Sequence, residues 1–484
     1  MTEAAAPGHT RLRDLPAAFW WLWTAQLVVW IGRFVVPYMT IFLTSSVGMS
    51  AGQAGLVVAA YGVGVVVSSL TGGVLADRIG RRKVLLGSEL LSVLVLVLVP
   101  LVEGPLLTAA LLCVYGLFNG AAGPVIHTMV GDLVEPRHRR TAFNYNYWAV
   151  NLGYAIGPLA AGFMAEHSFS LLFWCQAALV LVSASVLAAK VPETRTHVPG
   201  PDPVAAAPTG ADGAAPHAAA VAAGRGRRED GLLSVLSDRV FITFAAVMFV
   251  YSCVYVQSTT TLPLVMTEQG HPSSHFGMLL TLNGVLLCVL QLPTARLFNR
   301  WSRDLVIVLA IAVTAVGVGL QAAASTLALY AVAVAVWTLG EMGSHPQATS
   351  LTADLADPRR RGRYQGVYGL THSLAMAVGP VAGGFVLDAF GSRVLWLGAS
   401  ALALVVAALL AVTARARQRR VAEVTSADAA RRTARSAASA SPGPRADPRE
   451  TAAKHHRDGG ETRPVHAAAA TPAVAQRQNV PPQP

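Results

Sequence analysis

Long apolar runs alternate with short polar connections along most of the chain. An α-helix needs about 20 predominantly apolar residues to cross the hydrocarbon core of a bilayer. The pattern therefore predicts an all-α polytopic membrane protein with twelve transmembrane helices, at residues 17–44, 53–76, 84–102, 105–131, 142–165, 168–189, 240–267, 274–298, 304–323, 325–351, 364–388 and 392–414.

Composition and charge agree with a membrane protein. Only 13% of the residues are charged and 53% are hydrophobic, whereas soluble domains are about a quarter charged. The net charge of +11 does not indicate nucleic-acid binding, because the basic residues cluster in short connections at 78–83, 137–140, 300–303 and 359–361. By the positive-inside rule these connections and both termini face the cytoplasm, in a plasma (inner) membrane.

Two long polar segments interrupt this pattern, and both are rich in Ala, Pro, Gly and Arg. Such segments cannot bury a core and are expected to be disordered. We therefore predict five parts: a cytoplasmic N-terminus at 1–16, a six-helix bundle at 17–190, a disordered cytoplasmic linker at 191–239, a second six-helix bundle at 240–414 and a disordered cytoplasmic tail at 415–484.

The two predicted bundles share an internal repeat. The run Gly157–Gly162 reappears as Gly379–Gly384, an offset of 222 residues, which is the difference between positions 380 and 158. The same offset relates further pairs, namely Asp132 with Asp354, Pro124 with Pro346, Arg78 with Arg300, Arg81 with Arg303, and Asp77 with Asn299. The sequence thus predicts two pseudo-symmetric halves with the same chain direction.

The connection after the second predicted helix resembles the signature of the major facilitator superfamily. Its residues are Gly73, Asp77, Arg78, Gly80, Arg81, Arg82 and Lys83. The resemblance implies two halves around a central cavity that opens alternately to each side of the membrane. It also implies a conformational latch made of Gly73, Asp77, Arg78, Gly80, Arg81 and Asp132, in which Asp77 links to the start of the eleventh helix near Arg363. The alternative for Arg82 and Lys83 is a simple positive-inside anchor.

The run Gly153–Pro158 partly resembles a motif of drug:proton antiporters. One departure is Gly116, which stands where those antiporters usually carry an arginine in the fourth helix. Small residues at four-residue spacing pack membrane helices closely, and proline bends them. We therefore expect Gly157, Pro158, Gly379 and Pro380 to serve helix bending and packing, the alternative being a seal against leak between the halves.

Charged residues inside the predicted helices are candidates for function, because a charge in the bilayer interior is costly. Arg33 and Glu341 lie near the middle of helices that line the cavity in this family. The polar residues expected in the substrate cavity or in proton coupling are Arg33, Asn119, Asn144, Tyr147, Asn151, Tyr255, Glu341, His345 and His372. The alternatives are buried ion pairs or ordinary interhelical hydrogen bonds. Glu89 is expected to reach the water interface instead.

No motif indicates an enzyme, a cofactor or a metal site, and no phosphate-binding loop is present. The resemblance implies a secondary active transporter, working as a monomer, that exports an amphipathic organic compound in exchange for protons. The alternatives are a proton symporter or uniporter importing a small metabolite, and a non-transporting membrane receptor or scaffold. The expected partners are a small organic substrate, protons and the lipid bilayer, without nucleic acid.

Overall fold

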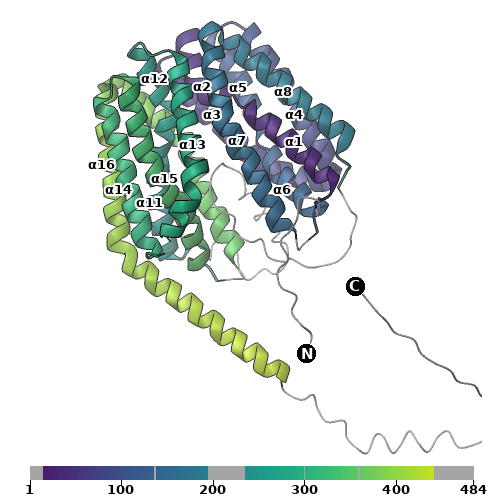
Figure 1. The fold of residues 1–484 in the computed structure, drawn as a ribbon, viewed down its shortest axis with the longest axis vertical. Coiled ribbons are helices and arrows are strands. Elements are labelled where there is room, and N and C mark those ends of the chain that lie inside the picture. The colour runs from purple at the N-terminus through teal and green to yellow at the C-terminus, as the bar shows by residue number, and fades with distance from the viewer. Residues whose placement is uncertain (1–14, 136–137, 195–234, 299, 358–359, 441–484) are drawn as a thin grey trace, which may run out of the picture. The chain divides into compact units, whose positions relative to one another are not determined.

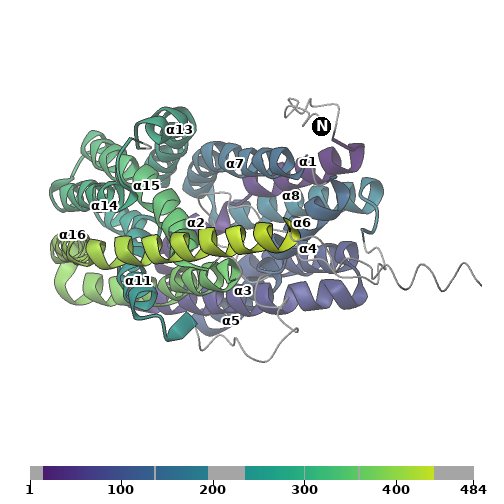
Figure 2. The same cartoon turned by 90° about the horizontal axis from the view of Figure 1, so that it is seen from below.

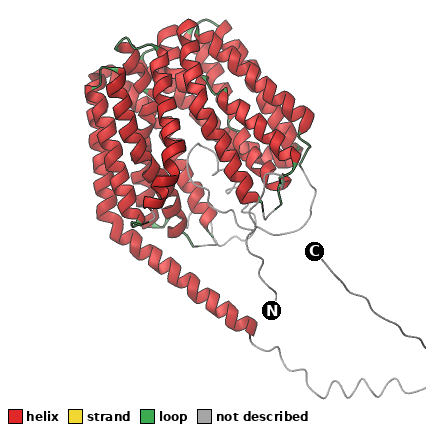
Figure 3. Cartoon of the chain, in the orientation of Figure 1, coloured by secondary structure: helices red, strands yellow, loops and turns green. Residues whose placement is uncertain are grey.

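The computed structural model describes residues 15–135, 138–194, 235–298, 300–357 and 360–440. Helices make up nearly all of this part of the chain, and it contains no strand (Figure 3). The predicted N-terminal segment and linker lie almost entirely outside the described residues. The fold class predicted from the sequence is confirmed.

The helices of the first half lie within residues 17–190. Their bounds are α1 Ala17–Ile31, α2 Val35–Ile41, a π-helical turn Phe42–Ser46, α3 Ala51–Ile79, α4 Arg81–Leu98, a 3₁₀ turn Val99–Leu101, α5 Pro105–Asn119, α6 Ala122–Leu133, α7 Arg139–His167 and α8 Phe169–Lys190.

The helices of the second half begin at Arg239. Their bounds are α11 Arg239–Thr260, α12 Leu262–Glu268, α13 Ser273–Phe298, α14 Arg303–Leu320, a 3₁₀ turn Gln321–Ala323, α15 Leu327–Leu355 and α16 Arg361–Ala440. Figures 1 and 2 show α1 to α8 in one group and α11 to α15, with the first part of α16, in another. Helices α7 and α13 lie side by side where the two groups meet.

Ten segments of the described chain are long and apolar enough to cross a membrane. The last of these includes Gly391, where the backbone leaves the helical conformation at φ 79° and ψ 172°, so this segment is two helices joined at a kink. Helix α7 is 29 residues long but carries many polar residues. Together these helices supply the twelve predicted segments, and the number of membrane crossings stays a prediction.

The first predicted helix is broken into α1 and α2 at residues 32–34. The break frees backbone N–H groups, which must find partners when buried. The side-chain amide oxygen of Gln176 in α8 accepts hydrogen bonds from the backbone N–H of Phe34 at 3.0 Å and of Val35 at 2.8 Å. Gln176 also donates to the Tyr115 hydroxyl at 2.6 Å. One buried glutamine therefore holds the break in place.

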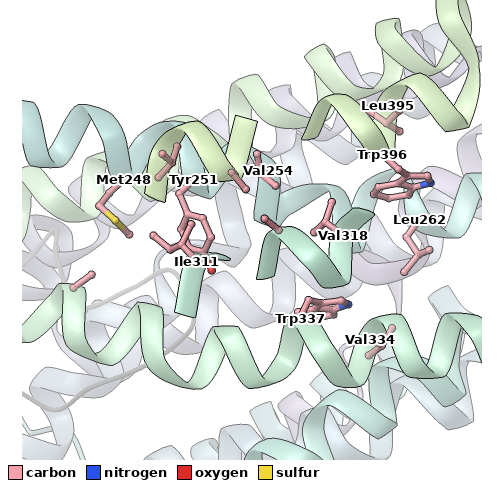
Figure 4. Packing of buried hydrophobic residues seen from close by; sticks show 14 of the residues in the cluster. Met248, Tyr251, Val254, Leu262, Ile311, Val318, Val334, Trp337, Leu395 and Trp396 are labelled. Atoms are coloured by element: carbon pink, nitrogen blue, oxygen red, sulfur yellow. The ribbon is translucent and has the colours of Figure 1, made fainter. Parts of the chain in front are cut away.

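Each half is packed around buried apolar side chains. The first half has two clusters, one around Leu85 and Met129 and one around Leu96 and Leu112. In the second half a single cluster extends through α11, α12, α14, α15 and α16 (Figure 4). This cluster also includes Tyr38 of the first half, so the packing continues from one half into the other.

The two ends of the bundle differ in charge. The described residues of the basic connections, at 77–83, 138–140, 300–303 and 360–361, lie at one end of each half, which we call the basic side. The other end holds Ser50, Gly104, Ser168, Gly270 and Gly391, and we call it the opposite side. This naming makes no assumption about which end faces the cytoplasm.

Two expectations differ from the structure. Glu89 was expected at the water interface, but its side chain is buried, 6% exposed, and accepts a hydrogen bond from the Ser183 hydroxyl of α8 at 3.1 Å. That expectation is wrong because α8 covers this face of α4. The last helix was expected to end at residue 414 and continues to Ala440. Residues 415–440 are rich in Ala and Arg, which favour helix, and Arg417 forms a buried ion pair with Asp304 at 2.6 Å.

Candidate functional site

The structure supports the repeat with an offset of 222 residues. Arg81 forms an ion pair with Asp132, and the equivalent Arg303 forms one with Asp354. Each pair joins the connection after the second helix of its half to the end of the fourth. The network of Arg81 and Asp132 expected from the family resemblance is therefore present in both halves.

The other residues of the predicted latch lie around Gly80. Gly80 alone separates α3 from α4, and its φ of +109° favours glycine. Asp77 is exposed and lies 3.9 Å from Arg81, and among the described residues no contact between Asp77 and α16 is seen. Arg78 is exposed. A Cβ at Gly73 would have no neighbour within 4 Å, so this conformation does not need glycine at that position.

One residue of this region, Glu193, was not predicted from the sequence. The Glu193 carboxylate, which follows α8, accepts hydrogen bonds from the backbone N–H groups of Arg81 at 2.8 Å and Arg82 at 3.3 Å. It thereby caps the N-terminus of α4, where the first N–H groups have no partner within the helix. Glu193 lies 112 positions after Arg81 in the sequence, so no local sequence pattern predicts this cap.

In the second half the predicted residues Tyr255 and Glu341 meet. The Glu341 carboxylate is buried, 2% exposed. It accepts a hydrogen bond from the Tyr255 hydroxyl at 2.6 Å and another from the Asn283 side-chain amide at 2.9 Å. Asn283, which lies on α13 and was not predicted, also donates to the Thr338 hydroxyl at 3.0 Å. We call Tyr255, Asn283 and Glu341 the acidic triad.

In the first half the predicted residues Arg33 and Asn119 meet at the Tyr61 hydroxyl. Asn119 donates to this oxygen at 2.7 Å, and Arg33 hydrogen-bonds to it as well. The guanidinium carbon of Arg33 lies 4.5 Å from the centre of the Trp30 ring, a cation–π contact. The Arg33 Nε atom is buried without a hydrogen-bond partner among the described residues. We call Arg33, Tyr61 and Asn119 the basic triad.

The two triads occupy equivalent positions of the repeat. The offset of 222 residues takes Arg33 to Tyr255, Tyr61 to Asn283 and Asn119 to Glu341. In both triads the side chains of the first, second and fourth predicted helices of a half meet through hydrogen bonds. The basic triad carries a cation and the acidic triad a carboxyl group. The same frame therefore holds a basic side chain in one half and an acidic side chain in the other.

Of the two predicted histidines, His345 lies beside the acidic triad and His372 lies beside His345. The His345 ring is 4.9 Å from the Tyr255 ring and 6.5 Å from the His372 ring, measured between centres. The Trp337 ring lies 5.8 Å from Tyr255 on another side. The surroundings of Glu341 are therefore mainly aromatic, with a second group nearby that can bind a proton.

Two of the three predicted polar residues of α7, Tyr147 and Asn151, have described side chains. Asn151 donates to the backbone carbonyl of Tyr147 in its own helix at 3.1 Å, as in ordinary helix packing. Tyr147 is partly buried. The side chain of Asn144 lies outside the described residues. The role expected of these three residues in the substrate cavity therefore stays a prediction.

The Gly-Pro pairs lie in close helix contacts. A Cβ at Gly157 would be 2.6 Å from the Ile31 carbonyl oxygen, and one at Gly379 would be 3.4 Å from the equivalent carbonyl, that of Cys253. These glycines thus pack each fifth helix against the first helix of its own half. The carbonyl oxygens of Pro158 and Pro380 instead face the other half, against Gly277 and Gly55 respectively.

The described residues contain no group of three or more His, Cys, Asp or Glu side chains that could hold a metal ion. The four cysteines are free. The side chains of the two triads offer hydrogen bonding, charge pairing and proton binding.

Comparison with known proteins agrees with this architecture. A family model described as Major Facilitator Superfamily matches residues 22–274 and 258–447. The multidrug resistance protein MdtH of Yersinia pestis is 23% identical over 368 residues, which cover 75% of this chain and 85% of that protein. An uncharacterized MFS-type transporter of Bacillus subtilis, YttB, is 26% identical over 375 residues, covering 77% and 88%.

Solved structures share the fold. A POT family transporter in complex with 5-aminolevulinic acid superposes with a TM-score of 0.67 at 14% identity, covering 83% of this chain and 97% of that one. The nucleoside transporter NupG superposes with a TM-score of 0.63 at 12% identity, covering 82% and 99%. The family match over most of the sequence, together with the helical fold, shows that this chain belongs to the Major Facilitator Superfamily and is a multi-pass membrane transporter rather than an enzyme.

Proposed function

We propose that this transporter exports an amphipathic organic compound in exchange for protons. The observation that carries the proposal is the acidic triad, in which a buried carboxyl group receives two hydrogen bonds inside a membrane bundle. Ionised groups are costly to bury, and a carboxyl group avoids that cost by binding a proton. Glu341 is therefore the proposed proton carrier, with His345 as a neighbouring group that can exchange the proton.

The substrate class is inferred from the surroundings of the triad. Binding pockets for organic molecules are mostly aromatic and apolar, with a few placed polar groups. Tyr255, Trp337, His345 and His372 provide this combination around Glu341. The name of the relative MdtH, a multidrug resistance protein, supports the same class.

The proposed mechanism is alternating access by rocking of the two halves. We propose that the basic side faces the cytoplasm, together with the predicted segments 1–16, 191–239 and 415–484. The protein would work as a monomer in the plasma (inner) membrane. The cross-half hydrogen bonds of Tyr38, Ala51, Gly52 and Ser274 lie on the opposite side. The proposed latch at Asp77 would act on the basic side when that side closes.

The test uses purified full-length protein in liposomes that contain the trapped pH-sensitive dye pyranine. Ethidium, tetraphenylphosphonium or dialanine is added outside, in separate experiments. Exchange of an entering compound for protons should make the lumen more alkaline, and Glu341→Gln should abolish this change. If none of the three compounds moves protons beyond the level in protein-free liposomes, the proposal in this form is wrong.

The second candidate is a proton symporter that imports a small anionic metabolite. The basic triad favours it, because the partly buried Arg33 has a buried Nε atom without a hydrogen-bond partner among the described residues, which suits an anionic group. In the same assay a symporter should acidify the lumen when substrate enters. A non-transporting receptor on the same fold should give no pH change with any compound, while cells lacking it lose a signalling response.

A further inference from the structure

An aspartate of the second half caps a helix of the first half on the opposite side. Asp388, near the end of the eleventh predicted helix, accepts hydrogen bonds from the backbone N–H groups of Ala51 at 3.1 Å and Gly52 at 2.8 Å. These are the first two residues of α3. The next N–H group, that of Gln53, is bonded by the Ser50 hydroxyl. The cap by Asp388 therefore completes the N-terminus of α3 from the other half of the molecule.

The equivalent glutamate of the first half makes the reverse contact. Glu166, near the end of α7, accepts a hydrogen bond from the backbone N–H of Ser274 at 3.1 Å. Ser274 is the second residue of α13. The offset of 222 residues takes Glu166 to Asp388 and Gly52 to Ser274. The same interaction is thus present twice, each half capping a helix of the other.

Close glycine contacts surround both caps and obey the same offset. Gly55 packs against the Pro380 carbonyl oxygen, and its equivalent Gly277 packs against that of Pro158. Likewise Gly384 packs against the start of α3 and Gly162 against the start of α13. Any side chain at these glycines would overlap backbone atoms of the other half. The backbones on this side therefore lie at contact distance, which brings each carboxylate to its helix end.

We propose that Asp388 and Glu166 are a pair of gating residues that holds the two halves together on the side opposite the basic connections. A helix N-terminus carries partial positive charge and N–H groups without partners in the helix, and a carboxylate satisfies both. When this side opens, Asp388 and Glu166 leave these helix ends, and the N–H groups there form hydrogen bonds with water instead. This cap pair is separate from the latch at Asp77, which belongs to the other side.

Glu166 is in the charged form that the proposal requires. It follows the predicted span 142–165 and is exposed to solvent. The hydrogen bonds from Ser274 hold the pKa of its carboxyl group below the ordinary value, and the nearby His167 and His275 act in the same direction. At neutral pH the cap of α13 is therefore made by a carboxylate.

The test measures the distance between the halves on the opposite side, with the full-length protein in lipid nanodiscs. The four cysteines are replaced by serine, and spin labels are attached after Ser46→Cys and Ser325→Cys, two exposed positions of this side in different halves. The variants are Asp388→Ala, Glu166→Ala and the double substitution, with Glu103→Ala as a matched control in an exposed connection of the same side. Asp388→Asn, which keeps one acceptor oxygen, should shift the distances less than Asp388→Ala.

The parent should show mainly the short distance that belongs to a closed opposite side. Each alanine variant should raise the ratio of long to short distances about 5- to 30-fold, the effect expected from losing one helix cap, and the double variant should raise it further. The control should match the parent. A double variant with the parent's distance distribution, recovered from size-exclusion chromatography as folded protein, would overturn the proposal.

The proposal rests on the proposed function only in assuming that the halves move. The two fail in different ways. If no tested compound is transported but the distances shift as expected, the cap pair stands and the proposed substrate class falls. If transport occurs and the distances do not change, the gating role of Asp388 and Glu166 is wrong.

Discussion

The strongest test of the proposed proton carrier is Glu341→Gln, because it changes one atom of the acidic triad. Glutamine keeps one acceptor oxygen but places an NH₂ group where the other oxygen was. Tyr255 and Asn283 both donate to Glu341, at 2.6 and 2.9 Å, so one of them will then face a second donor. A hydrogen bond to a charged group contributes about 1.5–3 kcal/mol.

Loss of one such bond corresponds to roughly a tenfold to hundredfold change in the equilibrium between states. The fold should survive, since Tyr255 can reverse its hydroxyl and accept from the amide. Proton coupling should be lost, because the glutamine amide does not bind a proton at the pH values of the assay. We therefore expect no transport driven by a pH gradient, whereas exchange of labelled for unlabelled substrate at equal pH continues, slowed by about a hundredfold at most.

Both rates are measured in liposomes with a compound that the pyranine assay has identified. Asn283→Ala is the matched control, since it removes a donor and leaves the carboxyl group. It should slow driven transport without abolishing it. If Glu341→Gln transports as well as the parent under a pH gradient, Glu341 is not the proton carrier and the reasoning from the acidic triad fails.

Three further predictions concern packing and stability. Gly277→Val should weaken closure of the opposite side, seen as longer spin-label distances, because the new side chain overlaps the proline carbonyl of α7. The control Gly87→Ala, where a Cβ has open space, should leave the distances unchanged. Arg417→Ala should lower the free energy of unfolding by about 3–5 kcal/mol, because it leaves Asp304 buried and unpaired. Adding Asp304→Ala should restore part of the loss. Equal melting temperatures for Arg417→Ala and the parent would contradict this prediction. Gln176→Leu should lower the free energy of unfolding by about 1–3 kcal/mol for each backbone N–H that it leaves unsatisfied at the helix break. Denaturation in detergent measures this change, and an unchanged free energy would show that another group replaces the Gln176 side chain.

The sequence predicts the fold well because it carries one strong local signal and one strong long-range signal. Helix length and apolarity define the spans, and the repeat relates distant positions without any structure. The pairing of Arg81 with Asp132 followed from the family resemblance, and its copy at Arg303 and Asp354 follows from the offset. In this way the arrangement of each half could be predicted.

The contacts that complete the site were harder to predict. Helices that are apolar on all sides carry little periodic signal for the face that points inward. Asn283 and Tyr61 are single polar residues on such helices, and only their partners show their importance. Glu193 and Asp388 bind backbone N–H groups, which every residue but proline has, so the sequence marks no partner for them. Adding the offset of 222 residues to Arg33 and Asn119 gives Tyr255 and Glu341. The repeat could therefore have predicted that these two residues lie together.

The paired caps give the contact between the halves the form of an isologous dimer interface. In a two-fold dimer, residue i of one subunit meets residue j of the other, and j meets i in return. Here Glu166 meets the start of α13 and its equivalent Asp388 meets the start of α3. The chain thus resembles a homodimer whose subunits were joined end to end. In such an interface a substitution in one half leaves the equivalent contact of the other half in place.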